Sequence, residues 1–171
     1  MASYNTLDDL FAAHPDLTGK RVVLRADLNV PVSDGDVTDD TRIARVAPTI
    51  RELADRGATV VVLSHFGRPK GQPNLDYTLR PVAASLQSHS DKPVDFVETD
   101  WAEQGPEAAL ARAVPGQVLL VENTRFNPGE EADDPAFAKR LGLLGDIYVN
   151  DAFSAAHRAH ASTHGIARLL P

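Results

Sequence analysis

The 171-residue sequence contains no cysteine, which excludes disulfide bonds and thiolate chemistry and makes a reducing cytoplasm the expected compartment. It has no run near the roughly 18 consecutive apolar residues of a membrane-spanning helix. The start, MASYNTLDDLF, lacks the basic segment and apolar run of a secretory signal. Positive charge is not in excess either, because 24 acidic residues outnumber 17 basic ones and give a net charge of −7. We therefore expect neither a membrane nor a nucleic-acid partner.

The remaining composition is that of an ordinary globular protein, with 43% hydrophobic and 24% charged residues, and the length suits one domain. Apolar, strand-like segments alternate with helical patterns. The expected strands are 21–26, 58–64, 93–97, 117–122 and 146–150, and the expected helices are 5–14, 41–57, 80–89, 105–114 and 133–145. This alternation predicts a single α/β domain with a doubly wound parallel sheet, a Rossmann-like three-layer sandwich.

Local signals mark some helix boundaries. Pro48, inside the 41–57 segment, predicts either a kink or a late start, and Gly57 suits the end of that helix. In the 133–145 segment, Asp134 is placed to act as the N-cap and Pro135 to take the first helical position.

Arginine follows or ends four of the five expected strands. Arg25, Arg68, Arg125 and Arg158 belong to the first, second, fourth and fifth, whereas the third runs into the residues 98–100, Glu-Thr-Asp, which offer no cation. Ligands of open parallel sheets bind beyond the carboxyl ends of the strands. The pattern therefore predicts a shared anion pocket at that edge of an otherwise acidic protein.

The loops at this edge supply further candidates. Arg42, in DDTRI, stands at the start of an expected helix, whose positive end favours anions. We expect His65, in LSHFGRPKG, to form one wall of the pocket together with Arg68. Each residue has an ordinary alternative: single arginines more often form surface salt bridges, lone histidines are more often structural, and Asp27 and Asn29 in DLNVP can be turn formers.

Other motifs are weaker evidence for a function. The sequence has neither GxxxxGK[ST] nor GxGxxG, and GRPKG does not substitute for them, so the residues alone favour a small anion over a nucleotide. His160 and His164 have a spacing found in metal sites, but no carboxylate or cysteine stands in register, and we expect no metal. Thirteen of the 17 basic residues are arginines, which indicates either genomic bias or rigid forks for carboxylate and phosphate.

Five segments in this order, VVLRADLNVP, DDTRI, LSHFGRPKG, ENTRFNPGEE and YVNDAFSAAHRAHAST, resemble phosphoglycerate kinase. The resemblance runs from about Lys20 to the last residue and covers the amino-terminal half of that family. Its enzymes have two α/β domains, of which the first binds 3-phosphoglycerate and the second binds Mg-ADP or Mg-ATP. The resemblance thus implies that residues 1–171 are the amino-terminal, substrate-binding domain and that the nucleotide-binding domain is absent from this chain.

The resemblance also implies roles for individual residues. Arg25 and Arg42 would be catalytic, nearest the phosphoryl group in flight. Asp27 and Asn29 would bind the hydroxyl and carboxylate end of the substrate, and three further arginines would hold its phosphate. The complete substrate-binding set is Asp27, Leu28, Asn29, Arg42, His65, Phe66, Gly67, Arg68, Arg125, His157 and Arg158.

Two positions depart from the family pattern. Ser154 replaces the usual glycine, which is strained only if φ there is positive, and Thr124 replaces the usual valine. Neither change removes a charged candidate.

The implied reaction converts 1,3-bisphosphoglycerate and ADP into 3-phosphoglycerate and ATP, with magnesium on the nucleotide. The partner would be the carboxyl-terminal domain of the same enzyme, which we expect to be a monomer, and we expect no turnover from this chain by itself. Two other readings stay open: a stand-alone anion-binding module that has lost catalysis, and a purely structural domain whose arginines are solvated.

Overall fold

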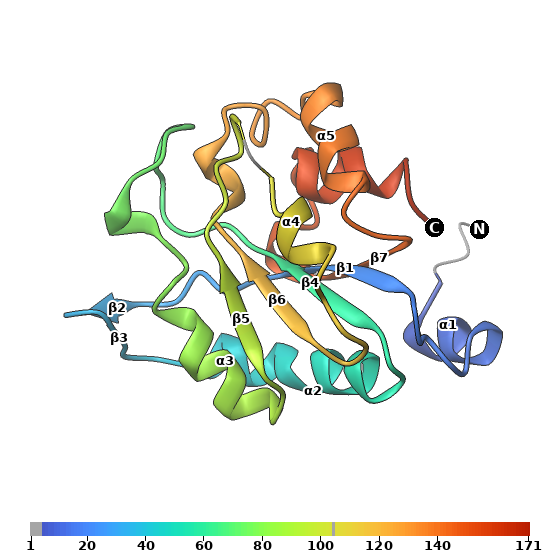
Figure 1. The fold of residues 1–171 in the computed structure, drawn as a ribbon. Helices are drawn as coiled ribbons and strands as arrows, with labels where there is room; N and C mark the ends of the chain where they lie inside the picture. The colour runs from blue at the N-terminus through green and yellow to red at the C-terminus, as the bar shows by residue number, and fades with distance from the viewer. Residues whose placement is uncertain (1–4, 104) are drawn as a thin grey trace.

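A computed structural model describes residues 5–103 and 105–171, and its centre is a parallel sheet of five strands (Figure 1). The order across the sheet is β5-β6-β4-β1-β7, and every neighbouring pair is parallel. The strands are β1 (Arg21–Ala26), β4 (Thr59–Leu63), β5 (Val94–Val97), β6 (Val118–Val121) and β7 (Ile147–Asp151). A small antiparallel hairpin of β2 (Val32–Ser33) and β3 (Asp36–Val37) lies in the loop after β1. The predicted parallel α/β fold is confirmed.

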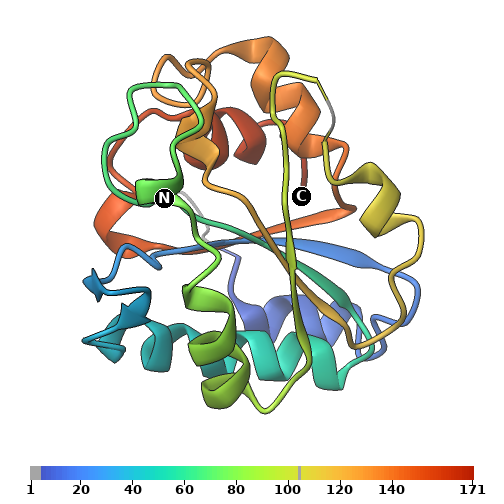
Figure 2. The ribbon, with the colours of Figure 1, turned by 60° about the vertical axis from the view of Figure 1, so that its left-hand side comes forward.

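Helices cover both faces of the sheet (Figures 1 and 2). On one face lie α1 (Leu7–Ala13), α2 (Thr41–Asp55) and α3 (Val82–Ser90); on the other lie α4 (Glu107–Leu110), α5 (Pro135–Gly142) and the helical turn 161–165 near the end of the chain. None of the helices in the described ranges is long and apolar enough to cross a membrane.

Two hydrophobic cores result from the alternation of side chains along the strands. In β1, Val22 and Leu24 pack into the core shared with α2 and α3, whereas Val23 packs into the core shared with α5. Strands buried on both faces need continuous apolar residues, which explains why these segments stand out in the sequence.

The helix boundaries agree with the local signals in part. Asp134 caps α5, its carboxylate accepting a hydrogen bond from the Phe137 amide at 2.8 Å, and Pro135 is the first helical residue. The late start considered for α2 is wrong: the helix begins at Thr41 and continues past Pro48 to Asp55. Pro48 lies on the exposed side, where water can bond the carbonyl that its missing N–H leaves free.

The helix expected over 105–114 is wrong in extent, because α4 comprises only Glu107–Leu110. Its alanines favour a helix, but Leu110 is the one buried residue of this single turn, so packing adds little.

Candidate functional site

A cavity of about 260 Å³ lies at the carboxyl edge of the sheet, where loops following four strands converge. Its cationic lining consists of four arginines, and one carboxylate, that of Asp27, faces them. Eight of the eleven predicted substrate residues line it, together with two more; the full lining is Asp27, Asn29, Arg42, His65, Gly67, Arg68, Arg125, Ser154, Ala155 and Arg158. A chain with a net charge of −7 therefore concentrates positive charge at one small site.

Asp27 and Arg42 form an ion pair across the mouth of the cavity. Nη1 of Arg42 lies 3.0 Å and 3.1 Å from the two carboxylate oxygens and also donates to the Asn29 carbonyl at 3.2 Å. Burial opposes ionisation of Asp27, but hydrogen bonds from Ser154 and the Asn29 amide, with the charge of Arg42, outweigh it and lower the pKa of this carboxyl. Asp27 is thus a carboxylate whose oxygens are already engaged.

Gly67 brings the loop after β4 against the loop after β1. Its amide donates to Oδ1 of Asn29 at 3.1 Å, and its carbonyl accepts from Nη1 of Arg125 at 3.0 Å. Its φ is +59°, and a Cβ atom there would lie 2.3 Å from the ring of Tyr77. Both the backbone angle and the space require glycine at this turn.

Asn123, in ENTRFNPGEE, holds two of these loops together. The side chain is fully buried. Its Oδ1 accepts from the amides of Phe66 at 3.2 Å and Arg125 at 3.0 Å, and its Nδ2 donates to the carbonyls of Phe66 at 2.7 Å and Tyr77 at 2.9 Å. Only the residue type could have indicated this, because Asn satisfies donors and acceptors at once.

Arg125 is the most rigidly held arginine of the lining. Only 6% of its side chain is exposed, and its Nε lies 3.8 Å from a carboxylate oxygen of Glu131. Burial lowers the pKa of Arg125, and the neighbouring guanidinium groups of Arg158 and Arg68 lower it further. Arg68 and Arg158 are exposed and free to adapt to a ligand.

His65 lines the cavity as a neutral imidazole. Its burial, and the charges of Arg25 and Arg125, lower the pKa of His65 to about 3. Nη2 of Arg25 lies 2.8 Å from Nδ1. Because a guanidinium has only donors, Nδ1 accepts this bond and the ring proton lies on Nε2. His65 therefore offers the cavity an N–H donor and no additional charge.

Four predicted residues lie outside the lining. Arg25 is 0% exposed beneath His65. Leu28 and Phe66 belong to the hydrophobic core, and their amides are bonded to Ser64 and Asn123. His157 lines a separate, open hollow on the other side of Arg158. A ligand contact by any of the four stays a prediction.

The two departures from the family pattern fit without strain. Ser154 is not among the described non-glycine residues with positive φ, so serine is accommodated there. Its hydroxyl donates to Oδ2 of Asp27 at 2.5 Å, which adds a bond that glycine cannot make. Thr124 is buried, and its hydroxyl donates to the Ser64 carbonyl at 3.3 Å.

The histidine pair with metal-like spacing is used elsewhere. His160 is buried, and Nδ1 of His164 lies 2.5 Å from Oδ2 of Asp133. Within residues 5–103 and 105–171 no group of three or more potential ligands is arranged to hold a metal ion.

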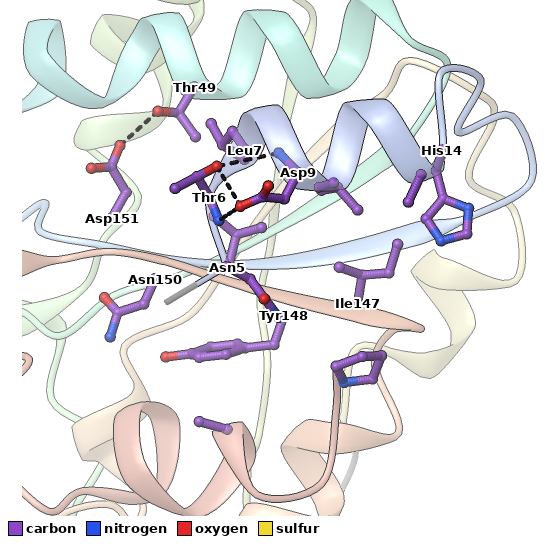
Figure 3. A pocket seen from close by; sticks show the side chains of 15 residues that line it. Asn5, Thr6, Leu7, Asp9, His14, Thr49, Ile147, Tyr148, Asn150 and Asp151 are labelled. Carbon is purple, nitrogen blue, oxygen red and sulfur yellow. Dashed lines mark hydrogen bonds between the residues drawn. The ribbon is translucent and has the colours of Figure 1, made fainter. Parts of the chain in front are cut away.

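A larger cavity, of about 940 Å³, lies between α1 and β7 (Figure 3). It has no arginine or lysine in its lining. Its carboxylates are already bonded, Asp9 to Thr6 at 2.8 Å and Asp151 to Thr49 at 2.8 Å, as the dashed lines in Figure 3 mark. Size alone would favour this cavity as the binding site, but the converging charged groups favour the smaller one.

The fold and the cavity define an α/β domain with an arginine-lined cavity at the carboxyl edge of its sheet. Comparison with known proteins makes this specific: the family model described as phosphoglycerate kinase matches residues 11–171, and the chain belongs to that family. It is 57% identical over 171 residues to phosphoglycerate kinase of Chelativorans sp. (strain BNC1), and 58% identical over 169 residues to that of Rhodospirillum centenum. These alignments cover 100% and 99% of the chain but only 42% and 41% of the relatives.

Solved structures agree. A phosphoglycerate kinase from Coxiella burnetii superimposes with a TM-score of 0.79 at 43% identity, covering 92% of this chain and 39% of the other. One from Pyrococcus horikoshii OT3 superimposes with a TM-score of 0.79 at 35% identity, covering 91% and 40%. The chain thus spans about two fifths of the proteins that it matches.

Proposed function

We propose that this chain is the substrate-binding domain of a phosphoglycerate kinase, which transfers a phosphoryl group from 1,3-bisphosphoglycerate to ADP to give 3-phosphoglycerate and ATP. The observation that carries the proposal is the cavity of about 260 Å³ in which four guanidinium groups face one carboxylate. The substrate, 3-phosphoglycerate, carries a phosphate and a carboxylate, and arginine forks match the geometry of both.

The lining suggests how the substrate is oriented. Arg68, Arg125 and Arg158 would hold the phosphate, with Arg125 as the rigid anchor and the other two adapting to it. Asp27, with its ion-pair partner Arg42, would bind the hydroxyl and carboxylate end. These groups offer hydrogen bonds of the charge-assisted kind, each worth roughly 1.5–3 kcal/mol.

Transfer itself requires in-line positioning and neutralisation of charge more than covalent chemistry. The two predicted catalytic residues, Arg25 and Arg42, differ in whether a transferred group can reach them. Arg42 lies half-exposed at the mouth, where a transferred group can reach it. Arg25 is buried, so its charge acts on the cavity through His65.

Nucleotide binding would come from a second domain. The relatives are more than twice as long as this chain, and neither glycine-rich phosphate motif occurs in it. Mg-ADP or Mg-ATP would be brought to the cavity by closure of that domain, the magnesium neutralising phosphate charge. The chain by itself would then bind 3-phosphoglycerate without catalysing any transfer.

Calorimetric titration of 3-phosphoglycerate into the chain, at low and at higher salt, tests the site. Saturable binding that weakens with salt is expected. Arg42→Ala and Arg125→Ala should each weaken it at least tenfold, about 1.4 kcal/mol. Arg45→Ala is the control, because Arg45 is exposed one turn along the same helix and does not line the cavity.

Unchanged affinity in both arginine variants would refute the assignment of the site. If the substrate binds but a carboxyl-terminal domain from a relative, added in trans, restores no turnover, the chain is an anion-binding module without catalysis.

A further inference from the structure

A buried charged network lies directly beneath the cavity, between the sheet and the layer of α5. The guanidinium of Arg25 and the carboxylate of Glu130 are both fully buried. Burying an unpaired charge is strongly unfavourable, so each needs compensation inside the protein. Burial raises the pKa of Glu130 and the positive charge of Arg25 opposes that rise.

Ser162 joins these two groups. Its hydroxyl accepts a hydrogen bond from Nε of Arg25 at 2.8 Å and donates one to Oε1 of Glu130 at 2.5 Å. Its amide donates to the other carboxylate oxygen at 3.1 Å, and the neighbouring Ala161 amide donates to the Glu130 carbonyl at 2.9 Å. The turn that contains Ser162 is thus fixed to the loop that precedes α5, and the hydroxyl can point in only one direction.

The network continues to the cavity wall. Arg25 is held at Nε by Ser162 and at Nη1 by the Ala26 carbonyl, which leaves Nη2 aimed at Nδ1 of His65, 2.8 Å away. His65 lines the cavity. A guanidinium in this position can only donate, so the orientation of Arg25 decides which ring nitrogen of His65 carries the proton.

We propose that Glu130 and Ser162 are positioning residues that, through Arg25, fix the tautomer of His65 and so present a neutral Nε2–H donor to the anion cavity. The inference rests on the proposed function only for the identity of the anion.

The charges around His65 explain what this arrangement achieves. The charges of Arg25, Arg125 and Arg158, which come from three different segments, lower the pKa of His65, and the carboxylate of Asp27 raises it. A protonated ring would add a further cation to this group. With Nδ1 occupied as an acceptor, His65 can donate to a bound anion through Nε2 without any change in its own charge, as a preorganised donor does.

Nitrogen-15 NMR of the full chain with labelled histidine tests the proposal in the absence of any ligand. His65→Gln identifies the signal by its loss. In the native protein His65 should be a single Nε2–H tautomer that stays neutral at pH 5. Ser162→Ala and Glu130→Gln should each produce a mixture of tautomers, because Arg25 is no longer held against Nδ1.

Ser90→Ala is the matched control. Ser90 is also fully buried, its hydroxyl has no hydrogen-bond partner among the described residues, and it lies at the end of α3, outside the cavity lining. This variant removes the same buried hydroxyl and should leave the His65 signals unchanged. A native protein with the proton on Nδ1 overturns the proposal without any variant, even if the substitutions prevent folding. Folded Ser162→Ala and Glu130→Gln proteins with the native tautomer overturn it as well.

The proposal on the His65 tautomer and the proposal on the substrate can be refuted separately. Titration of 3-phosphoglycerate into the same samples should show about a tenfold weaker affinity for Ser162→Ala, the low end for one charge-assisted hydrogen bond. A native protein with the expected tautomer that binds no 3-phosphoglycerate would refute the proposed function and leave the positioning network intact. Variants that bind 3-phosphoglycerate normally and keep the native tautomer would refute the positioning network and leave the proposed function intact.

Discussion

Replacing Asn123 by alanine tests whether the anion cavity depends on one buried amide. The side chain bonds two backbone amides and two backbone carbonyls that belong to Phe66, Arg125 and Tyr77. Alanine cannot replace any of these bonds. All of the affected groups lie around a fully buried position, so water has little access to them.

The cost can be estimated from the groups left without a partner. A buried donor or acceptor that loses its hydrogen bond costs about 1–3 kcal/mol. Counting only the amides of Phe66 and Arg125, because a carbonyl tolerates a missing partner better, gives about 2–6 kcal/mol. Against the typical 5–15 kcal/mol of a whole domain, this is a large loss. The affinity for 3-phosphoglycerate should fall at least tenfold in addition, because Arg125 loses its backbone anchor.

Urea unfolding followed by circular dichroism gives the free energy of unfolding, provided that the m-value is unchanged. Asn74→Ala is the control, because Asn74 is exposed and makes a single capping bond, to the Asp76 amide at 2.9 Å, worth about 1 kcal/mol. Asn123→Asp should be no milder than alanine, because it buries a carboxyl group whose second oxygen would face the carbonyls of Phe66 and Tyr77. A loss below about 1 kcal/mol for Asn123→Ala would refute the reasoning.

Two further outcomes are expected. Ser154→Gly removes the hydroxyl that is bonded to Asp27 and so frees a carboxylate oxygen for the substrate. Calorimetry should show about two- to tenfold tighter binding of 3-phosphoglycerate, the value of one net hydrogen bond. Ser154→Ala separates this effect from the flexibility of glycine, and weaker binding in both variants would contradict the prediction. His65 has a pKa of about 3 in the folded state and about 6.5 when unfolded, so between these values the unfolded chain binds the extra proton and stability falls as the pH falls. The slope should reach about 1.4 kcal/mol per pH unit, and in urea titrations at several pH values His65→Gln should lack this part; an equal slope in both proteins would contradict it.

The strands and their common edge were predictable because they depend on local pattern and on one topological rule. Segments buried on both faces must be continuously apolar, and parallel strands must end at the same edge. Arg68, Arg125 and Arg158 come from three separate loops, yet this rule was sufficient to predict that they meet, and the structure brings them into one cavity.

The place of Arg25 in the fold also has a signal in the sequence. Side chains alternate along a strand, so Arg25 shares the face of Val23 and not the face of Leu24. It therefore points into the layer between the sheet and α5, where Ser162 and Glu130 meet it. Those two partners could not be predicted, because the contact joins segments 137 residues apart, and no local pattern specifies it.

The other differences have the same cause. His157 and Arg158 are neighbours after the same strand, but only Arg158 lines the anion cavity, whereas both line the second hollow. Asn123 looked like part of a loop, and only the approach of the β4 loop shows that its amide is surrounded by backbone. Local sequence determines which elements form, whereas the partners of a buried polar group depend on how those elements pack.

The wall of the anion cavity is built from the loops after β1, β4, β6 and β7, and this has a thermodynamic consequence. No single unit of the fold contains the site, so a chain with any of these strands displaced has lost it. An anion that binds here therefore contacts loops from four of the five strands, and its free energy of binding adds to the free energy of global unfolding. At 100 times its dissociation constant such a ligand would stabilise the fold by about 2.7 kcal/mol. The concentration of the bound metabolite would then set how long the polypeptide survives proteases that cleave only the unfolded form.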